Sequence, residues 1–164
     1  MKMHNNSVKK PMNVEIKQIT LDADFSELAQ QIAAAQWDDA NEIEPQEYSA
    51  ECIRNFVEHP RSVLIFAYLG NTFAGLTSGT VQAHPHGSGK WLYVDEVDTA
   101  VDQRRKGVGK AMMEWCFDYA KTNGLKEVAL GTERDNVAAR GLYDSLKPSY
   151  TEDVIWYGYE VGNE

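Results

Sequence analysis

The feature that most constrains the fold of this chain is a change of hydrophobic period near its centre. Before residue 60 the apolar residues recur at helical intervals, whereas Ser62 to Leu69 is a continuous apolar run. The run ends in Gly70-Asn71, a dipeptide typical of a tight hairpin turn, and Thr72 to Gln82 has the pattern of a returning strand. The sequence therefore predicts a β-hairpin that follows a helical region.

The same patterns predict the other elements. Asp24 and Glu27 have capping-box spacing at the start of a first helix, and Pro45 suits the first turn of a second. Further strands are expected over 13–20, 91–100, 127–131 and 154–161, and further helices over 108–122 and 136–146. The predicted fold is mixed α/β, in the order β-α-α-β-β-β-α-β-α-β, with a mostly antiparallel sheet and helices on both faces. We expect residues 1–11 to be a disordered tail and 12–164 to form a single domain.

Composition excludes several classes of protein. The 164 residues are 43% apolar and 25% charged, which is typical of a globular protein, and no run approaches the roughly 20 apolar residues of a membrane span. The two cysteines, Cys52 and Cys116, both fall in helical patterns and predict a reduced, cytoplasmic protein. The net charge of −9 argues against a nucleic-acid partner. Residues 22–58 carry ten acids and one base, Arg54, so the excess negative charge belongs to that segment.

The strongest local motif is Arg104-Arg-Lys-Gly-Val-Gly-Lys110, between a predicted strand and a predicted helix. Its two glycines permit a sharp turn, and the helix that follows directs unpaired N–H groups at the turn, an arrangement that suits phosphate oxygens. A dinucleotide fingerprint would need a glycine where Met112 stands, and a P-loop would need Ser or Thr where Ala111 stands. A surface turn with solvated basic side chains remains the alternative at this point.

The neighbours of the turn decide between these interpretations. The stretch from Glu96 to Met112 resembles the central motif of the GNAT superfamily of acyl-CoA-dependent N-acyltransferases. A second stretch, Asn136 to Tyr143, resembles the Asn-x-x-Ala-x-x-Leu/Phe-Tyr motif that follows the next strand in that superfamily. The resemblance extends over about 100 residues, from Val63 to Val161. One departure is Leu146-Lys147-Pro148, where relatives usually carry Leu-Gly-Phe.

The resemblance implies the GNAT fold, acetyl-CoA as co-substrate and a set of residues that bind it. The pyrophosphate would lie on the amides of the turn, and the pantetheine arm would pair with the end of the preceding strand. Asn136, Ala139 and Tyr143 share a helix face and would contact the arm. The remaining residues expected to bind the coenzyme are Val97, Asp98, Thr99, Ala100, Val101, Arg104, Arg105, Lys106, Gly107, Val108, Gly109 and Lys110.

Two residues are candidates for proton transfer. Tyr143 would protonate the departing thiolate as general acid, although a tyrosine at this position can also be a core aromatic. Glu96 matches the place where many relatives carry a catalytic glutamate, and would take a proton from the acceptor amine. Asp98, two residues along the same strand, is expected on the same side, and Asp95 on the opposite side.

The acceptor is expected to be a cationic small amine of the polyamine or aminosugar type, drawn by the acidic segment. Its proposed contacts are Asp38, Asp39, Glu42, Glu44 and Asp98. No metal is expected, because His84 and His86 have no third ligand nearby. Two alternatives stay open: a protein N-terminal or lysine acetyltransferase, and a non-catalytic acyl-CoA-binding regulatory protein. Whether the chain forms a homodimer is also left open.

Overall fold

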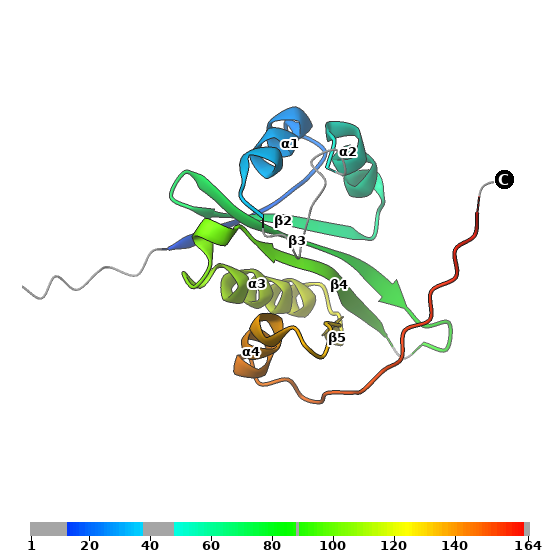
Figure 1. The fold of residues 1–164 in the computed structure, drawn as a ribbon. Helices are drawn as coiled ribbons and strands as arrows, with labels where there is room; N and C mark the ends of the chain where they lie inside the picture. The colour runs from blue at the N-terminus through cyan, green and yellow to red at the C-terminus, as the bar shows by residue number, and fades with distance from the viewer. Residues whose placement is uncertain (1–12, 38–47, 88, 163–164) are drawn as a thin grey trace, which may run out of the picture. The chain divides into compact units, whose positions relative to one another are not determined.

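A computed structural model describes residues 13–37, 48–87 and 89–162 of the chain, drawn as a ribbon in Figure 1. The chain divides into two compact units, residues 1–131 and 132–164. The tail expected over residues 1–11 lies outside the described residues.

The first unit contains one five-stranded sheet whose strands lie side by side in chain order (Figure 1). Its strands are β1 (Val14–Gln18), β2 (Ser62–Leu69), β3 (Thr72–Ala83), β4 (Lys90–Thr99) and β5 (Glu127–Leu130). The first three pairings are antiparallel and the pairing of β4 with β5 is parallel. The predicted mixed, mostly antiparallel sheet is thus confirmed, and the predicted hairpin over Ser62 to Gln82 is β2 and β3.

In the described part of the first unit, each α-helix begins at a side-chain cap or at a glycine, and the 3-10 helix η2 (Val101–Gln103) begins after Ala100 without a side-chain cap. The α-helices are α1 (Phe25–Ala34), α2 (Ala50–Glu58) and α3 (Val108–Thr122). Asp24 caps α1 by accepting from the Glu27 amide at 3.0 Å, as its spacing predicts. Ser49 caps α2 by accepting from the Cys52 amide at 3.1 Å. The predicted start of this helix at Pro45 is wrong, because the Ser49 cap fixes the start at Ala50; Pro45 itself lies outside the described residues.

Strand β2 is buried on both faces, which explains its continuous apolar run. Val63, Ile65 and Ala67 belong to a core that includes Val108, Met112 and Cys116 of α3. Leu64 and Phe66 belong to a second core with Phe25, Leu28 and Ile32 of α1 and Ile53 of α2. In Figure 1, α1 and α2 accordingly lie on one face of the sheet and α3 on the other. Helices on both faces are therefore confirmed.

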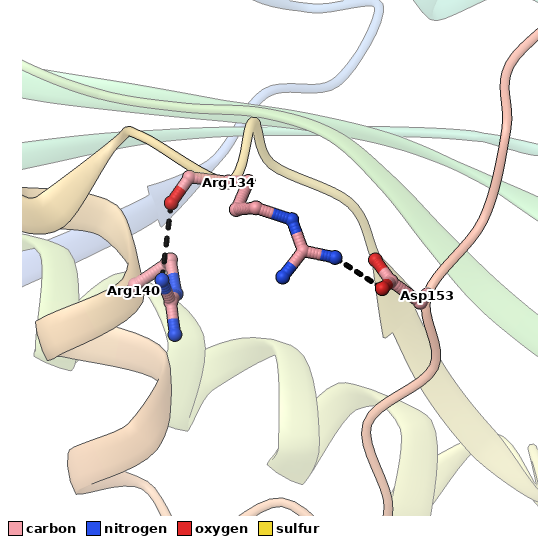
Figure 2. A network of polar contacts seen from close by, with 3 residues as sticks. All are labelled: Arg134, Arg140 and Asp153. Atoms are coloured by element: carbon pink, nitrogen blue, oxygen red, sulfur yellow. Dashed lines mark hydrogen bonds and ion pairs between the residues drawn. The ribbon is translucent and has the colours of Figure 1, made fainter.

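The second unit contains α4 (Val137–Ser145), preceded and followed by irregular chain. Asn136 caps α4 by accepting from the Ala139 amide at 3.0 Å. The Arg140 side chain donates from Nη1 to the Arg134 carbonyl oxygen at 3.0 Å, and the Arg134 guanidinium pairs with the Asp153 carboxylate (Figure 2). This network joins the start of α4 to the chain that follows it.

The strand predicted over Val154–Val161 is absent, which corrects the last element of the predicted order. Residues 151–162 adopt no regular secondary structure. Apolar, β-prone side chains alone do not make a strand, because a strand needs a partner for its backbone groups, and this segment belongs to no ladder in the described parts of the chain. The side chains are 72% to 92% exposed at Val154, Ile155, Trp156, Tyr157, Tyr159 and Val161.

Gly75 of β3 faces the β4 backbone at short range. A Cβ at Gly75 would lie 2.3 Å from the Asp98 carbonyl oxygen, so an added methyl group forces the strands apart. We expect Gly75→Ala to lower the free energy of unfolding by about 1–3 kcal/mol in urea denaturation. Gly141→Ala is the matched control, since Gly141 lies in α4 and a Cβ there meets nothing within 4 Å. Equal stability of wild type and Gly75→Ala would contradict the close approach.

Candidate functional site

A β-bulge in β4 determines which side chains reach the candidate site. Ser78 of β3 pairs with Glu96, but the next residue, Gly79, pairs with Val94, so Asp95 is an extra residue on β4. Val94 and Val97 both pack into the core on the α3 side of the sheet. The two residues between them, Asp95 and Glu96, line one pocket on the other side. The expectation that Asp95 points away from Glu96 is therefore wrong, because the bulge interrupts the alternation of side chains.

The pocket has a volume of about 360 Å³ and lies within the first unit. Its apolar wall comes from α2 and β2, and its polar groups come from β3, β4 and the residue before the α2 cap. The lining residues are Tyr48, Cys52, Ile53, Phe56, Leu64, Ser78, Asp95 and Glu96. Cys52, Ile53 and Phe56 of α2 line the pocket, and Tyr48 joins them from just before the helix.

Glu96 is held in this pocket by two hydroxyl groups. The Tyr48 hydroxyl donates to Glu96 Oε2 at 2.9 Å, and the Ser78 hydroxyl donates to the same oxygen at 2.6 Å. Two donors from separate elements fix the orientation of the carboxylate. Its other oxygen, Oε1, accepts no hydrogen bond from the described residues and can serve a ligand in the pocket.

Asp95 lies beside Glu96 in a partly desolvated position. Burial raises the pKa of the Asp95 carboxyl above its ordinary value, and the negative charge of Glu96 raises it further. The two causes are separate and act in the same direction, since both disfavour the charged form of the Asp95 carboxyl. A cation bound in the pocket would relieve this repulsion.

Beyond the bulge, no strand of the described residues pairs with one side of β4. Pairing of β4 with β5 stops at Val94 and Leu130, whereas β4 continues to Thr99. The segment Val97–Thr99, predicted to pair with the pantetheine arm, therefore lies at an open edge, where the Thr99 carbonyl accepts from Arg104 Nε at 3.4 Å. The next two amides of the predicted segment are already engaged: Ala100 donates to the Ala74 carbonyl at 3.0 Å and Val101 to the Gln36 carbonyl at 2.8 Å.

The backbone of the predicted phosphate turn has a positive φ at two residues, Arg105 and Gly107. Gly107 has a φ of +85° and caps α3 without a side chain, so no side-chain oxygen binds the amides of the first turn of α3. Gly109 lies inside that first turn. Arg105 also has a positive φ, +62°, which is strained for a residue with a Cβ.

The two lysines of the turn have different partners. Lys106 Nζ donates to the Asp102 carbonyl at 2.7 Å and to Gln103 Oε1 at 3.0 Å, so it stabilises the turn itself. Lys110 pairs with Glu114 one helical turn away at 3.7 Å, with both side chains exposed. An exposed pair of this kind is weak and can exchange its partner for a phosphate.

The second predicted motif lies on α4, in the second unit. Ala139 and Tyr143 are half-buried and one turn apart, whereas Asn136 is exposed. The Asn136 side-chain oxygen is occupied by the cap of α4, which gives this residue a structural role beside its predicted contact with the coenzyme arm. Its amide nitrogen and the second lone pair of the oxygen remain for such a contact.

Other predicted residues lie elsewhere. Asp38, Asp39, Glu42 and Glu44 fall outside the described residues. The His84 ring stacks on His86 and on Trp91, with centroid distances of 4.6 and 4.3 Å.

Across residues 13–37, 48–87 and 89–162, no three metal-binding side chains come together. Within the same ranges, no helix is long and apolar enough to cross a membrane.

Sequence reasoning found Glu96 and missed the other seven lining residues, among them Tyr48, Ser78 and Asp95. A signal for the bulge was present in the spacing of the core residues of β4. Leu92 and Val94 are two apart, as in a regular strand, but Val94 and Val97 are three apart. The contact of Tyr48 with Glu96 joins residues 48 positions apart and has no local signal.

Comparison with known proteins agrees with this architecture. Residues 29–147 match the model of the Acetyltransferase (GNAT) family. The uncharacterized N-acetyltransferase YhfO of Bacillus subtilis (strain 168) is 32% identical over 107 residues, which are 63% of this chain and 68% of that protein.

Two solved structures share the fold at low sequence identity. An aminoglycoside acetyltransferase, meta-AAC0020, from an uncultured soil metagenomic sample and in complex with sisomicin, has a TM-score of 0.74 and 16% identity, covering 91% of this chain and 97% of that one. The ribosomal-protein-alanine N-acetyltransferase of Brucella melitensis biovar Abortus 2308 has a TM-score of 0.64 and 19% identity, covering 92% and 100%. Because the family model matches more than half of the residues, this chain belongs to the GNAT family of acetyltransferases.

Proposed function

We propose that this enzyme transfers the acetyl group of acetyl-CoA, the co-substrate of its family, to the amine of a cationic small molecule. The observation that carries the proposal is the fixed Glu96 carboxylate, which lines an apolar-walled pocket next to the open end of β4. Acetyl transfer needs a base, a cavity for the acceptor and an edge for the arm that carries the thioester.

The reaction balances with the residues proposed. The acceptor enters as an ammonium ion and gives one proton to Glu96, directly or through water, and its nitrogen then attacks the thioester carbonyl carbon. The N–C bond forms, the negative charge on the oxygen is stabilised by a strand N–H near Val97, and the C–S bond breaks. Tyr143 gives its proton to the thiolate and takes up the second proton of the acceptor nitrogen, directly or through water, while Glu96 releases its proton to solvent. The products are an N-acetylated amine and coenzyme A.

The residues present fit the co-substrate. The first turn of α3 has amides without a side-chain cap, and the helix dipole favours the charge of a pyrophosphate there. The open edge at Val97–Thr99 suits an extended arm that carries amides, since such an arm can pair with a strand as a peptide does. Arg104, Arg105 and Lys110 add positive charge around the turn.

A cationic small molecule fits this acceptor pocket better than a protein does. The pocket contains two carboxylates and its volume of about 360 Å³ suits a compound of a few rings or a short chain. The ten acids between residues 22 and 58 add a field that attracts cations. The relative crystallised with sisomicin is named an aminoglycoside acetyltransferase, and this chain shares its fold.

The function is tested with a panel of amines and acetyl-CoA, with release of coenzyme A as the readout. We expect turnover with polyamines or aminosugars and a kcat/KM that falls as sodium chloride rises, because salt screens the attraction between the acidic segment and a cation. Peptides with a free N-terminus or a lysine are the comparison set. Turnover confined to peptides, or binding of acetyl-CoA without turnover on any amine, would contradict the proposal.

The role of Tyr143 is tested by removing its hydroxyl. Tyr143→Phe keeps the ring, so we expect unchanged acetyl-CoA affinity and a kcat lowered roughly 10- to 1,000-fold, as for a lost general acid. Steady-state kinetics with the best acceptor of the panel measure kcat, and calorimetry measures affinity. If wild type and Tyr143→Phe turn over at the same rate, Tyr143 is not the acid.

The coenzyme site is tested at Gly109. An aspartate there adds a carboxylate where the pyrophosphate would lie, so we expect Gly109→Asp to weaken acetyl-CoA binding severely in calorimetry. An acid in the first turn of a helix is favourable, and the variant should therefore fold. Gly109→Ala adds bulk without charge and should lose less affinity. Unchanged affinity of a folded Gly109→Asp protein would move the coenzyme away from this turn.

A further inference from the structure

The bulge in β4 gives the pocket two adjacent acids with unequal surroundings. Glu96 Oε2 already accepts hydrogen bonds from Tyr48 and Ser78. In the described parts of the chain, no hydrogen bond or ion pair engages the Asp95 carboxylate. The orientation of the Glu96 carboxylate is thus fixed, as a base requires. The Asp95 carboxylate is available to contact a ligand in the pocket.

The described lining of the pocket carries more negative than positive charge. The lining residues include two acids and no lysine, arginine or histidine among the described residues. A monoamine brings one positive charge, which would offset one carboxylate and leave the other exposed to like-charge repulsion. A ligand with two ammonium groups would offset both, and an ammonium on a carboxylate forms a charge-assisted hydrogen bond.

We infer that Asp95 determines acceptor specificity by binding a second, non-reacting ammonium group, so that the preferred acceptor is a compound with two amines joined by a short apolar linker. This inference rests on the proposed acetyl transfer and names its substrate class. Asp95 and Glu96 are neighbours on β4 and line the same pocket, so the proposal is for two amines separated by a few carbons. The linker would lie against Ile53, Phe56 and Leu64, which form the apolar wall.

The kinetic test compares 1,4-diaminobutane with butylamine, which differ by one amine on the same chain, in wild type and Asp95→Asn. We expect wild type to prefer the diamine, and Asp95→Asn to lower kcat/KM for the diamine about 10- to 100-fold, mainly through KM, with butylamine changed less than about twofold. Glu96→Gln should lower kcat for both amines. Asp118→Asn is the matched control, because it removes one exposed carboxylate from α3, on the other face of the sheet.

A second readout needs no turnover. Cys52 lines the pocket and is exposed, whereas burial raises the pKa of the Cys116 thiol to about 12 and keeps it protonated. Iodoacetamide should therefore modify Cys52, and peptide mapping by mass spectrometry measures the rate. We expect 1,4-diaminobutane to slow this alkylation in wild type and Asp118→Asn, and to lose that effect in Asp95→Asn.

The outcomes separate the two proposals. If amines are acetylated but Asp95→Asn keeps the wild-type preference between diamine and monoamine, the role of Asp95 is overturned and the acetyl transfer stands. If no amine is acetylated, the proposed function fails, and the alkylation rates alone decide whether Asp95 binds a diamine. Equal protection of Cys52 in wild type and Asp95→Asn by 1,4-diaminobutane overturns the inference in either case.

Discussion

The slip in register between β3 and β4 is the constraint on which the candidate site depends. One extra residue on β4 turns Asp95 and Glu96 to the same face of the sheet, although neighbours on a regular strand face opposite sides. The same slip coincides with the end of pairing between β4 and β5. The bulge thus brings two acids into the lining of one pocket. The open backbone edge of β4 begins at the same point of the strand.

The site is precise because the sheet that carries it is rigid. β2 and the first part of β3 are buried on both faces, and Gly75 and Gly79 bring the β3 backbone close to β4. Ser78, between these glycines, is fixed by its neighbours and donates to Glu96 at 2.6 Å. Tyr48 reaches the same oxygen from the segment before α2, so a rigid sheet and a helical layer together orient one carboxylate. A carboxylate held in this way loses little entropy when an acceptor binds.

Most of the fold follows from local patterns, and the exceptions have physical causes. The continuous apolar run of β2, the Asp24 cap and Gly107 at the start of α3 are all readable from the sequence, because each is a property of a few neighbouring residues. The start of α2 differs from the predicted one because Ser49, four residues after Pro45 in the sequence, supplies the side-chain cap. The last strand was misjudged because strand propensity says nothing about a partner.

The candidate site was predictable in part. Glu96 and the turn from Arg104 to Lys110 carry a family motif, whereas Asp95 required recognition of a bulge that a strict alternation rule hides. The hydrogen bond from Tyr48 depends on how α2 packs over the sheet, and such long-range contacts leave no trace in local spacing.

The chain beyond Asp153 has a practical consequence for handling the protein. Trp156, Tyr157 and Tyr159 are more than 70% exposed on a backbone that pairs with no strand in the described residues. Proteases bind their substrates as extended, accessible backbone, and an exposed segment of this kind is a preferred site of nicking. A protease that cleaves after aromatic residues should therefore trim the chain here first, while the two cores that flank β2 stay intact.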